Sequence, residues 1–271
     1  MGSASSSNNS GSPRGHGAGA MIHEVLPVGL LRCNCHIVGD AATHEAIVID
    51  PGEEVDRILA VLRRHGLKVR AILITHAHID HVGGLRKLRE ATGAPVMMHR
   101  EDLQLYRDME AQAAWSGFQA PALTEVDDFL REEQSIRWAG YDMRVLHTPG
   151  HSKGSVCLYL PLSAGEGTGA HAGKPIGRTP SASGAKRAAS GTGAAEPSAA
   201  TGAPGMLFAG DTLFAGNIGR TDLWGGSFEE IMRSLREKLL TLPEDVGVFP
   251  GHGPATTIGA ERETNPFLRG A

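Results

Sequence analysis

An apolar, β-branched run of residues leads directly into a cluster of ionisable side chains. The run is VRAILIT at residues 69–75, and the cluster that follows it consists of His76, His78, Asp80 and His81. A continuous apolar run of this length is typical of a strand that is buried on both faces. Three imidazoles and a carboxylate within six residues are typical of metal ligands, and the alternative interpretation is a solvated histidine-rich turn.

The spacing of these four residues indicates that they serve two cations. In an extended segment His76 and His78 point the same way, so both can reach one ion. Asp80 and His81 lie where the chain turns into the next predicted helix, and they face a different direction. One short loop can therefore supply ligands to two neighbouring ions, as hydrolytic two-metal sites require.

Three more polar residues follow predicted strands later in the chain. His151, Asp211 and His252 each come directly after an apolar run that ends in a glycine. Taken alone, each would more often be a surface or hydrogen-bonded polar residue. Ligands converge at the ends of strands in open α/β architectures, so three such positions after the first cluster favour one shared site.

The periodicity of apolar residues predicts a layered α/β sandwich. Strand-like patterns begin at Met21, and the first three predicted strands are most simply antiparallel. The expected strands are residues 21–30, 31–40, 45–50, 69–75, 94–99, 135–140, 142–148, 155–162, 206–211 and 246–252, and the expected helices are residues 53–67, 83–93 and 228–242. Strands that feed loops at one edge, with helices between them, are characteristic of this class.

Two segments have compositions that cannot support a packed core. Residues 1–20 are rich in Ser, Gly and Asn and lack the apolar centre of a secretory signal, so we expect a disordered leader, with an organellar transit peptide as the alternative. Residues 163–205 are mostly Gly, Ala, Ser, Pro and Thr, and we expect a disordered insertion between two adjacent strands. The predicted metal-binding domain extends over residues 21–271.

Charge and cysteine content argue against several classes of protein. The net charge is −4, from 26 basic and 30 acidic residues, and no basic stripe is present, so a nucleic-acid partner is not expected. No apolar stretch approaches the roughly 18 residues of a membrane-spanning helix. Cys33, Cys35 and Cys157 do not suggest a disulfide framework, and a reactive thiol is the lesser alternative. We therefore expect a soluble, cytoplasmic protein, and the sequence leaves its oligomeric state open.

The motifs THAHIDH, HTPGHSKGS, GDTLF and FPGHG closely resemble those of the metallo-β-lactamase superfamily, over nearly all of residues 21–271. The resemblance implies an αββα four-layer sandwich, in which two mixed β-sheets are flanked by helices. It also implies two divalent metal ions, with zinc preferred and iron or manganese as alternatives. By the same resemblance, His76, His78 and His151 bind the first ion, Asp80, His81 and His252 bind the second, and Asp211 bridges them.

Within the superfamily, GDTLFAGNIGRTDLWGGS and GHGPATTIGAERETNPFL resemble the short bacterial-type relatives of glyoxalase II, the hydroxyacylglutathione hydrolase. This likeness implies a thiolester hydrolase of methylglyoxal detoxification that cleaves S-D-lactoylglutathione or a similar small-molecule thiolester. Asp211 resembles the bridging carboxylate of thiolester and phosphodiester hydrolases, which true β-lactamases generally lack.

The sequence departs from glyoxalase II at its substrate-binding positions. Arg220 stands where the family has a glutathione-binding lysine, and Asp222 stands in place of a tyrosine. Arg220 could still attract a substrate carboxylate. Glyoxalase II also has a C-terminal helical domain that binds glutathione, whereas this chain ends soon after His252. These departures put glutathione recognition in doubt and leave the predicted hydrolytic residues unchanged.

The predicted mechanism uses a water molecule shared by both ions, which loses a proton near neutral pH and attacks the thiolester carbonyl. One ion polarises the carbonyl and the other receives the departing thiolate. Asp80 and Asp211 are the predicted catalytic residues, with Asp80 as the proton acceptor.

Two other functions compete with this interpretation. An iron-dependent glutathione persulfide dioxygenase shares the ligands and a Gly-Arg-Thr-Asp stretch like residues 219–222, but it uses a single iron. A non-catalytic metal-binding scaffold on the same fold is the second alternative. The GHGP context of His252 and the C-terminal tail favour the hydrolase. His99 and His147 either support the metal ligands or are ordinary hydrogen-bonding histidines.

Overall fold

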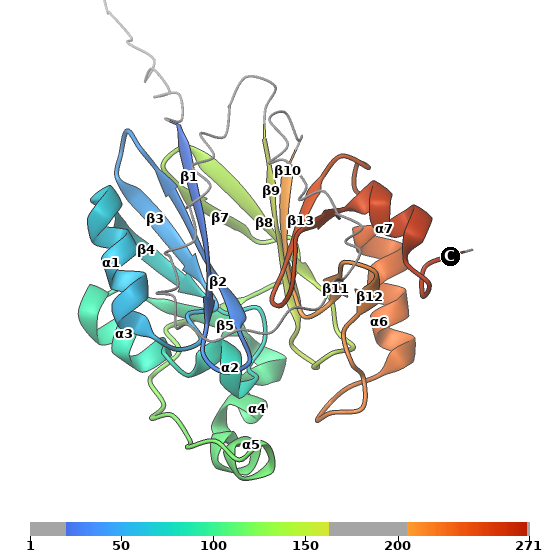
Figure 1. The fold of residues 1–271 in the computed structure, drawn as a ribbon, viewed down its shortest axis with the longest axis horizontal. Coiled ribbons are helices and arrows are strands. Elements are labelled where there is room, and N and C mark those ends of the chain that lie inside the picture. Colours follow the sequence, from blue (N-terminus) through green and yellow to red (C-terminus); the bar gives the residue numbers. More distant parts are fainter. Residues whose placement is uncertain (1–19, 163–204, 270–271) are drawn as a thin grey trace, which may run out of the picture.

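Two mixed β-sheets pack face to face in the computed structural model, which describes residues 20–162 and 205–269 (Figure 1). The first sheet has the order β1-β2-β3-β4-β5-β6, with bounds Met21–Val28, Cys33–Asp40, Glu45–Ile49, Lys68–Leu73, Val96–His99 and Asp128–Leu130. Its first three strands are antiparallel, as predicted, and β3 to β6 are parallel.

The second sheet has the order β14-β13-β10-β9-β8-β7. In chain order these strands are β7 (Ser135–Trp138), β8 (Tyr141–His147), β9 (Val156–Pro161), β10 (Gly205–Gly210), β13 (Gly247–Pro250) and β14 (Thr256–Thr257). Only β10 and β13 pair in parallel. A small ribbon of β11 (Leu213–Phe214) and β12 (Asn217–Ile218) follows β10.

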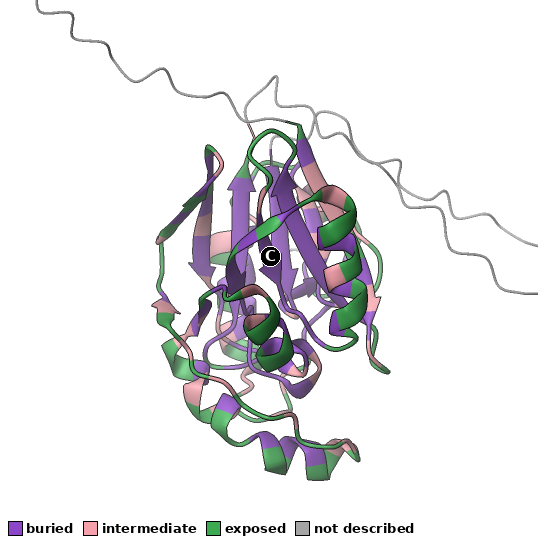
Figure 2. Ribbon diagram, turned by 90° about the vertical axis from the view of Figure 1, so that its left-hand side faces the viewer, coloured by how far each residue is buried: buried purple, intermediate pink, exposed green. Residues whose placement is uncertain are grey.

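Helices cover the outer face of each sheet. Against the first sheet lie α1 (Val55–His65), α2 (Ile79–Val82) and α3 (Leu85–Thr92); against the second lie α6 (Phe228–Ser234), which continues as a π-helical turn over Leu235–Leu239, and α7 (Ile258–Thr264). Figure 2 shows buried strands at the centre and helices that are exposed on their outer sides. The predicted αββα sandwich is therefore confirmed.

Strand β3 shows why its sequence is continuously apolar. Ile47 and Ile49 belong to the cluster between the two sheets, where they join Phe208 of β10. Ala46 and Val48 belong to the cluster between the first sheet and its helices. Because both faces of the strand are covered, no polar residue alternates with the apolar ones.

The segment between β5 and β7 contains structure that the periodicity did not predict. A 3-10 turn over Arg100–Asp102 leads into α4 (Leu103–Arg107) and α5 (Met109–Ser116), and β6 then closes the first sheet. Tyr106, Met109 and Ala113 bury one side of these helices against the first apolar cluster. Their spacing of three and four residues is a helical signal, but it is short and is divided between two helices.

The predicted insertion and leader fall almost entirely outside the described residues, so both stay predictions. The strands that flank the insertion, β9 and β10, are neighbours, because Pro161 pairs with Gly205 in an antiparallel ladder. Gly205 itself belongs to β10 rather than to the insertion. In the described ranges no helix combines the length and apolar character needed to cross a membrane.

Asp102 ties two loops from different sheets together. One carboxylate oxygen accepts hydrogen bonds from the Ala77 amide at 2.9 Å and the Ser152 hydroxyl at 2.8 Å, and the other accepts from the Gly154 amide at 2.6 Å. The Asp102 side chain is buried, so these three bonds replace hydration that the carboxylate has lost. The loops after β4 and β8 are therefore held at a fixed separation.

The hydrogen bonds of Asp102 predict what happens when one of its carboxylate oxygens is replaced by an amide nitrogen. Asp102→Asn should lower the free energy of unfolding by about 1–3 kcal/mol, because an amide nitrogen cannot accept a hydrogen bond and one buried donor loses its partner. Urea denaturation of the metal-free protein measures this change. Glu101→Gln is the matched control, since Glu101 is exposed beside it. Equal stability of the two variants would contradict the assigned network.

Candidate metal centre

The seven predicted ligands gather where strands of both sheets end. His76 and His78 lie in the loop after β4, Asp80 and His81 in α2, His151 after β8, Asp211 after β10 and His252 after β13. They form three overlapping groups in which the ligand atoms lie within 4.8 Å of one another: His76, His78 and His151; His76, His81 and Asp211; and Asp80, His81 and His252. Side chains that are distant in sequence thus form one cluster.

The first group consists of three buried histidines. The Nε2 atom of His151 lies 3.2 Å from Nε2 of His76 and 2.9 Å from Nδ1 of His78. A tetrahedral zinc ion with nitrogen ligands at about 2.0–2.1 Å separates those ligands by about 3.3 Å. The spacing of the three nitrogens is therefore close to what one ion requires.

The group of Asp80, His81 and His252 combines two histidines with a carboxylate. Oδ2 of Asp80 lies 3.1 Å from Nε2 of His252 and 3.8 Å from Nε2 of His81. Both side chains at the rim are partly exposed, whereas His81 is fully buried. A cation here would be reached from the side of Asp80 and His252.

Asp211 lies between the group of His76, His78 and His151, which would hold a first ion, and the group of Asp80, His81 and His252, which would hold a second. Its Oδ1 atom is 3.5 Å from Nε2 of His81, and its Oδ2 atom is 3.6 Å from Nε2 of His151 and 3.7 Å from Nε2 of His252. One carboxylate thus faces ligands of both groups, which is the placement that a bridging ligand needs.

Cations fit this cluster on the evidence of its own polar atoms. Nε2 of His81 and Oδ1 of Asp211 are buried and have no hydrogen-bond partner in the described part of the chain. Leaving such groups unpaired is costly, and a cation between them would remove that cost. Imidazole nitrogens and carboxylate oxygens are donors that zinc, iron and manganese all accept.

Burial and neighbouring charges set the protonation of the ligands. Burial and then the adjacent imidazoles lower the pKa of His76 well below its usual value and that of His78 to about 3. Burial raises the pKa of Asp211, but His81 beside it reverses this effect, and the resulting pKa lies well below the usual value. At neutral pH the two imidazoles are uncharged and the carboxylate is ionised, which are the forms that bind metal.

The loop that carries His76 and His78 is anchored at every second residue. The Asp50 carboxylate accepts hydrogen bonds from the Thr75 amide at 2.8 Å and the Thr75 hydroxyl at 2.6 Å. Asp102 accepts from the Ala77 amide, as described above. Because odd-numbered positions are held from one side, the side chains of His76 and His78 are presented to the other.

Gln112 anchors the next odd-numbered residue of the loop, Ile79. Its amide oxygen accepts from the Ile79 amide at 3.0 Å, and its amide nitrogen donates to the carbonyl of Ala77 at 3.1 Å. Gln112 is buried and comes from α5, the helix that the sequence did not predict. Asp50, Asp102 and Gln112 are therefore positioning residues that sequence reasoning missed.

Hydrogen bonds to the second ring nitrogen orient three of the histidines. Nδ1 of His151 donates to the carbonyl of Arg220 at 2.8 Å, and Nδ1 of His252 donates to that of Leu31 at 3.0 Å. Nδ1 of His81 lies 3.0 Å from Oδ2 of Asp50. In each ring Nε2 is thereby directed toward the cluster, where it could bind a cation.

Gly251 allows the end of β13 to pass through the cluster. A Cβ atom at this position would lie 2.7 Å from Cε1 of His81 and even closer to Oδ1 of Asp211. Both neighbours are predicted ligands, so neither can move aside without loss of the arrangement. A glycine is required here by close approach rather than by backbone conformation.

The predicted substrate-binding residue Arg220 already has a partner. Its guanidinium makes two 2.9 Å hydrogen bonds to the carboxylate of Asp222 and lies 5.8 Å from the centre of the Trp115 ring. A substrate carboxylate at Arg220 would have to compete with Asp222. The predicted role of Arg220 therefore stays a prediction.

The remaining singled-out residues lie outside the three ligand groups. The rings of His99 and His147 stack with their centroids 3.9 Å apart, and Nε2 of His147 lies 2.9 Å from the carbonyl of Lys153 in the loop that carries His151.

Cys33, Cys35 and Cys157 are free and buried, and burial raises the pKa of Cys33 to about 12 and that of Cys157 to about 11. These thiols are therefore protonated at neutral pH.

Curated relatives resemble this chain over almost their whole length. An uncharacterized protein of Aquifex aeolicus is 37% identical, covering 91% of this chain and 97% of that protein. The hydroxyacylglutathione hydrolase GloC of Haemophilus influenzae is 31% identical, with 90% and 97% covered.

Solved structures share the same architecture. The B3 metallo-beta-lactamase BLEG-1 is 31% identical with a TM-score of 0.73, covering 92% of this chain and 100% of that one. TTHA1623 in a di-iron-bound form is 35% identical with a TM-score of 0.67, covering 90% and 100%. The profile of the metallo-beta-lactamase superfamily matches residues 28–163 and 189–252, which include all seven clustered residues. The chain belongs to the metallo-beta-lactamase superfamily.

Proposed function

We propose that this protein is a dinuclear metal-dependent hydrolase that cleaves thiolesters, as a hydroxyacylglutathione hydrolase does, with S-D-lactoylglutathione or a similar thiolester as substrate. The observation that carries the proposal is the position of Asp211, whose two oxygens face ligands of both groups. The resemblance to a curated hydroxyacylglutathione hydrolase over 90% of the chain supports the thiolester.

Two divalent ions bound here, of zinc or alternatively iron or manganese, would acidify a water molecule and polarise a substrate carbonyl. His76, His78 and His151 would hold the first ion, Asp80, His81 and His252 the second, and Asp211 both. The side chains of Asp80 and Asp211 are 16% and 13% exposed, whereas that of His81 is fully buried. The substrate would therefore approach from the carboxylate side.

Asp80 is the residue best placed to accept a proton from the attacking water. Burial raises the pKa of Asp80, but His81 and His252 outweigh burial and lower it below its usual value. The carboxylate is therefore ionised at neutral pH, and its partial exposure leaves an oxygen accessible from the substrate side. Proton acceptance at Asp80 would accompany attack on the carbonyl.

Hydrolysis of β-lactams is a second candidate function. A solved structure with a TM-score of 0.73 and 31% identity is a B3 metallo-beta-lactamase, and β-lactam cleavage also needs water activated at a carbonyl. We favour the thiolester because Asp211 provides the carboxylate that true β-lactamases generally lack. The iron-dependent persulfide dioxygenase and the non-catalytic scaffold are separated from both by the tests below.

Metal content should follow the two ligand groups. We expect two metal equivalents per chain after reconstitution with zinc, and His252→Ala and His78→Ala should each lower the content toward one. Inductively coupled plasma mass spectrometry after dialysis measures this stoichiometry. His44→Asn is the control, because His44 is exposed outside the cluster and its positive φ is tolerated by asparagine. A wild-type protein that holds one iron and no second ion would instead favour the dioxygenase.

Turnover should depend strongly on Asp80. Asp80→Ala should lower kcat/KM for S-D-lactoylglutathione by roughly 10²–10⁴-fold, because both a general base and a ligand of the second ion are lost. Asp56→Ala is the matched control, since Asp56 is an exposed partner of Lys87.

The same preparations are assayed for nitrocefin hydrolysis and for oxygen uptake with glutathione persulfide. Near-normal thiolester hydrolysis by Asp80→Ala would overturn the two-metal scheme. Absence of all three activities in a fully metal-loaded protein would leave only the scaffold.

A further inference from the structure

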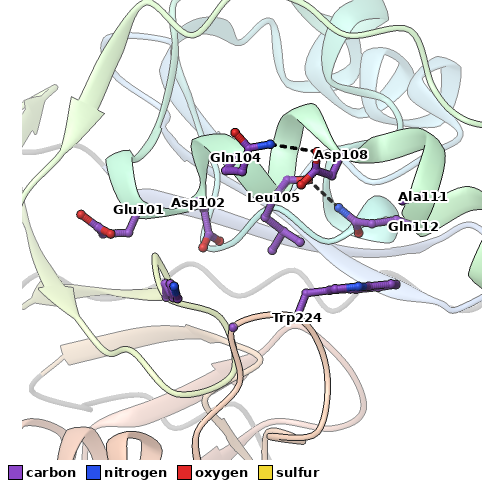
Figure 3. A pocket seen from close by; sticks show the side chains of 10 residues that line it. Glu101, Asp102, Gln104, Leu105, Asp108, Ala111, Gln112 and Trp224 are labelled. Carbon is purple, nitrogen blue, oxygen red and sulfur yellow. Dashed lines mark hydrogen bonds between the residues drawn. The ribbon is translucent and has the colours of Figure 1, made fainter.

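A pocket of about 220 Å³ lies between helices α4 and α5 and the loops that follow β8 and β12 (Figure 3). Leu105 and Gln112 line the helical side, and Lys153 and Trp224 line the loop side. Pockets that enclose a whole drug-sized ligand usually measure about 300–1,000 Å³. This pocket is therefore sized for one group of a substrate rather than for an entire molecule.

The pocket shares residues with the supports of the metal centre. Asp102 and Gln112 line it, and the same two side chains hold Ala77 and Ile79 between the predicted ligands. Lys153 lies two residues after His151 in the loop after β8. An occupant of the pocket would thus pack against both loops that carry the ligands of the first ion.

Trp224 forms one wall of the pocket, and Trp115 packs against Trp224. The indole of Trp224 lies across from the side chain of Leu105 in Figure 3. Trp115 meets Trp224 edge to face, with ring centroids 5.5 Å apart. Although both rings are large and apolar, they are 60% and 41% exposed for Trp115 and Trp224, respectively. Exposed contiguous aromatic surface beside a reactive centre is typical of a ligand-binding site.

The ionisable groups of the pocket are mostly acidic. Glu101, Asp102 and Asp108 contribute three carboxyl groups, and Lys153 contributes one amine. Arg220 lies near Trp115, but its charge is already paired with Asp222. An anionic group in this pocket would face more negative than positive charge from the lining side chains, whereas an uncharged group would gain the contacts of Leu105 and the indole without that repulsion.

We propose that this pocket is a substrate subsite that takes an uncharged apolar or aromatic group and selects against anionic groups. The inference rests on the proposed hydrolytic function and adds to it that the thiolester places a neutral group in this pocket, while carboxylates such as those of a glutathione thiolester lie outside it. The Trp224 ring would provide affinity for the apolar group, and the carboxyl groups that line the pocket would disfavour anions.

Two probes that share one phenylethyl group and differ in the charge of their head group test the proposal on the zinc-loaded protein. Isothermal titration calorimetry gives the Kd of 3-phenylpropanamide, which is neutral, and of 2-phenylethane-1-sulfonate, which is an anion and a poor metal ligand. We expect the amide to bind at least about tenfold more tightly than the sulfonate. Equal affinity, or tighter binding of the sulfonate, would overturn the proposed selection.

Matched variants assign the binding to the pocket. Trp224→Ala should raise the Kd of the amide by about tenfold and Trp224→Phe should raise it by much less, because the aromatic ring supplies the contact. Phe267→Ala is the control, since Phe267 is 43% exposed and does not line the pocket. Glu101→Gln should reduce the difference in Kd between the amide and the sulfonate. Glu110→Gln makes the same change at an exposed residue of α5 outside the pocket and should leave that difference unchanged. Unchanged amide affinity in Trp224→Ala would overturn the assignment.

Inhibition kinetics connect the pocket to catalysis. The amide should inhibit competitively whichever carbonyl substrate the protein hydrolyses, with an inhibition constant equal to its Kd. Binding without inhibition would show that the pocket is not a substrate subsite. Competitive inhibition of nitrocefin cleavage alone, without any thiolester hydrolysis, would reject the proposed thiolester function while the subsite itself stands.

Discussion

The structure depends on bringing five imidazoles and two carboxylates into one largely buried space. Nε2 of His151 lies within 3.2 Å of a nitrogen of His76 and of one of His78, a distance at which facing lone pairs repel unless a proton or a cation lies between them. Burial lowers the pKa of His76 and His78, so at neutral pH these two rings do not take up the extra protons that would remove the repulsion. Metal ions would resolve both the repulsion and the unpaired buried atoms of His81 and Asp211.

The loops that carry these residues come from both sheets, and the fold holds them together at one edge. The apolar layers between and outside the sheets make the strands rigid, and the ligands follow directly where strands end. Asp50, Asp102 and Gln112 then hold Thr75, Ala77 and Ile79, so the intervening side chains face the cluster. The preorganisation is carried by polar residues that bind no metal themselves.

The sequence predicted the sandwich and all seven clustered residues because their signals are local. Strand periodicity and the alternation of His76 and His78 can be recognised from neighbouring residues alone. The supports are different, because Asp102 and Gln112 act on a loop that lies 25 to 35 positions earlier in the chain. Helix α5 was missed as well, since a short helix with few buried residues has weak periodicity. The pairing of Arg220 with Asp222 depends on side-chain conformation, which residue types alone do not determine.

Anomalous X-ray diffraction from crystals of the reconstituted protein, recorded on both sides of the metal absorption edge, tests the central claim most directly. We expect two peaks about 3.5–4 Å apart, one within bonding distance of His76, His78 and His151 and one within bonding distance of Asp80, His81 and His252, with Asp211 within bonding distance of both. A metal-loaded crystal with no peak at these side chains, or with its metal bound elsewhere, would contradict it.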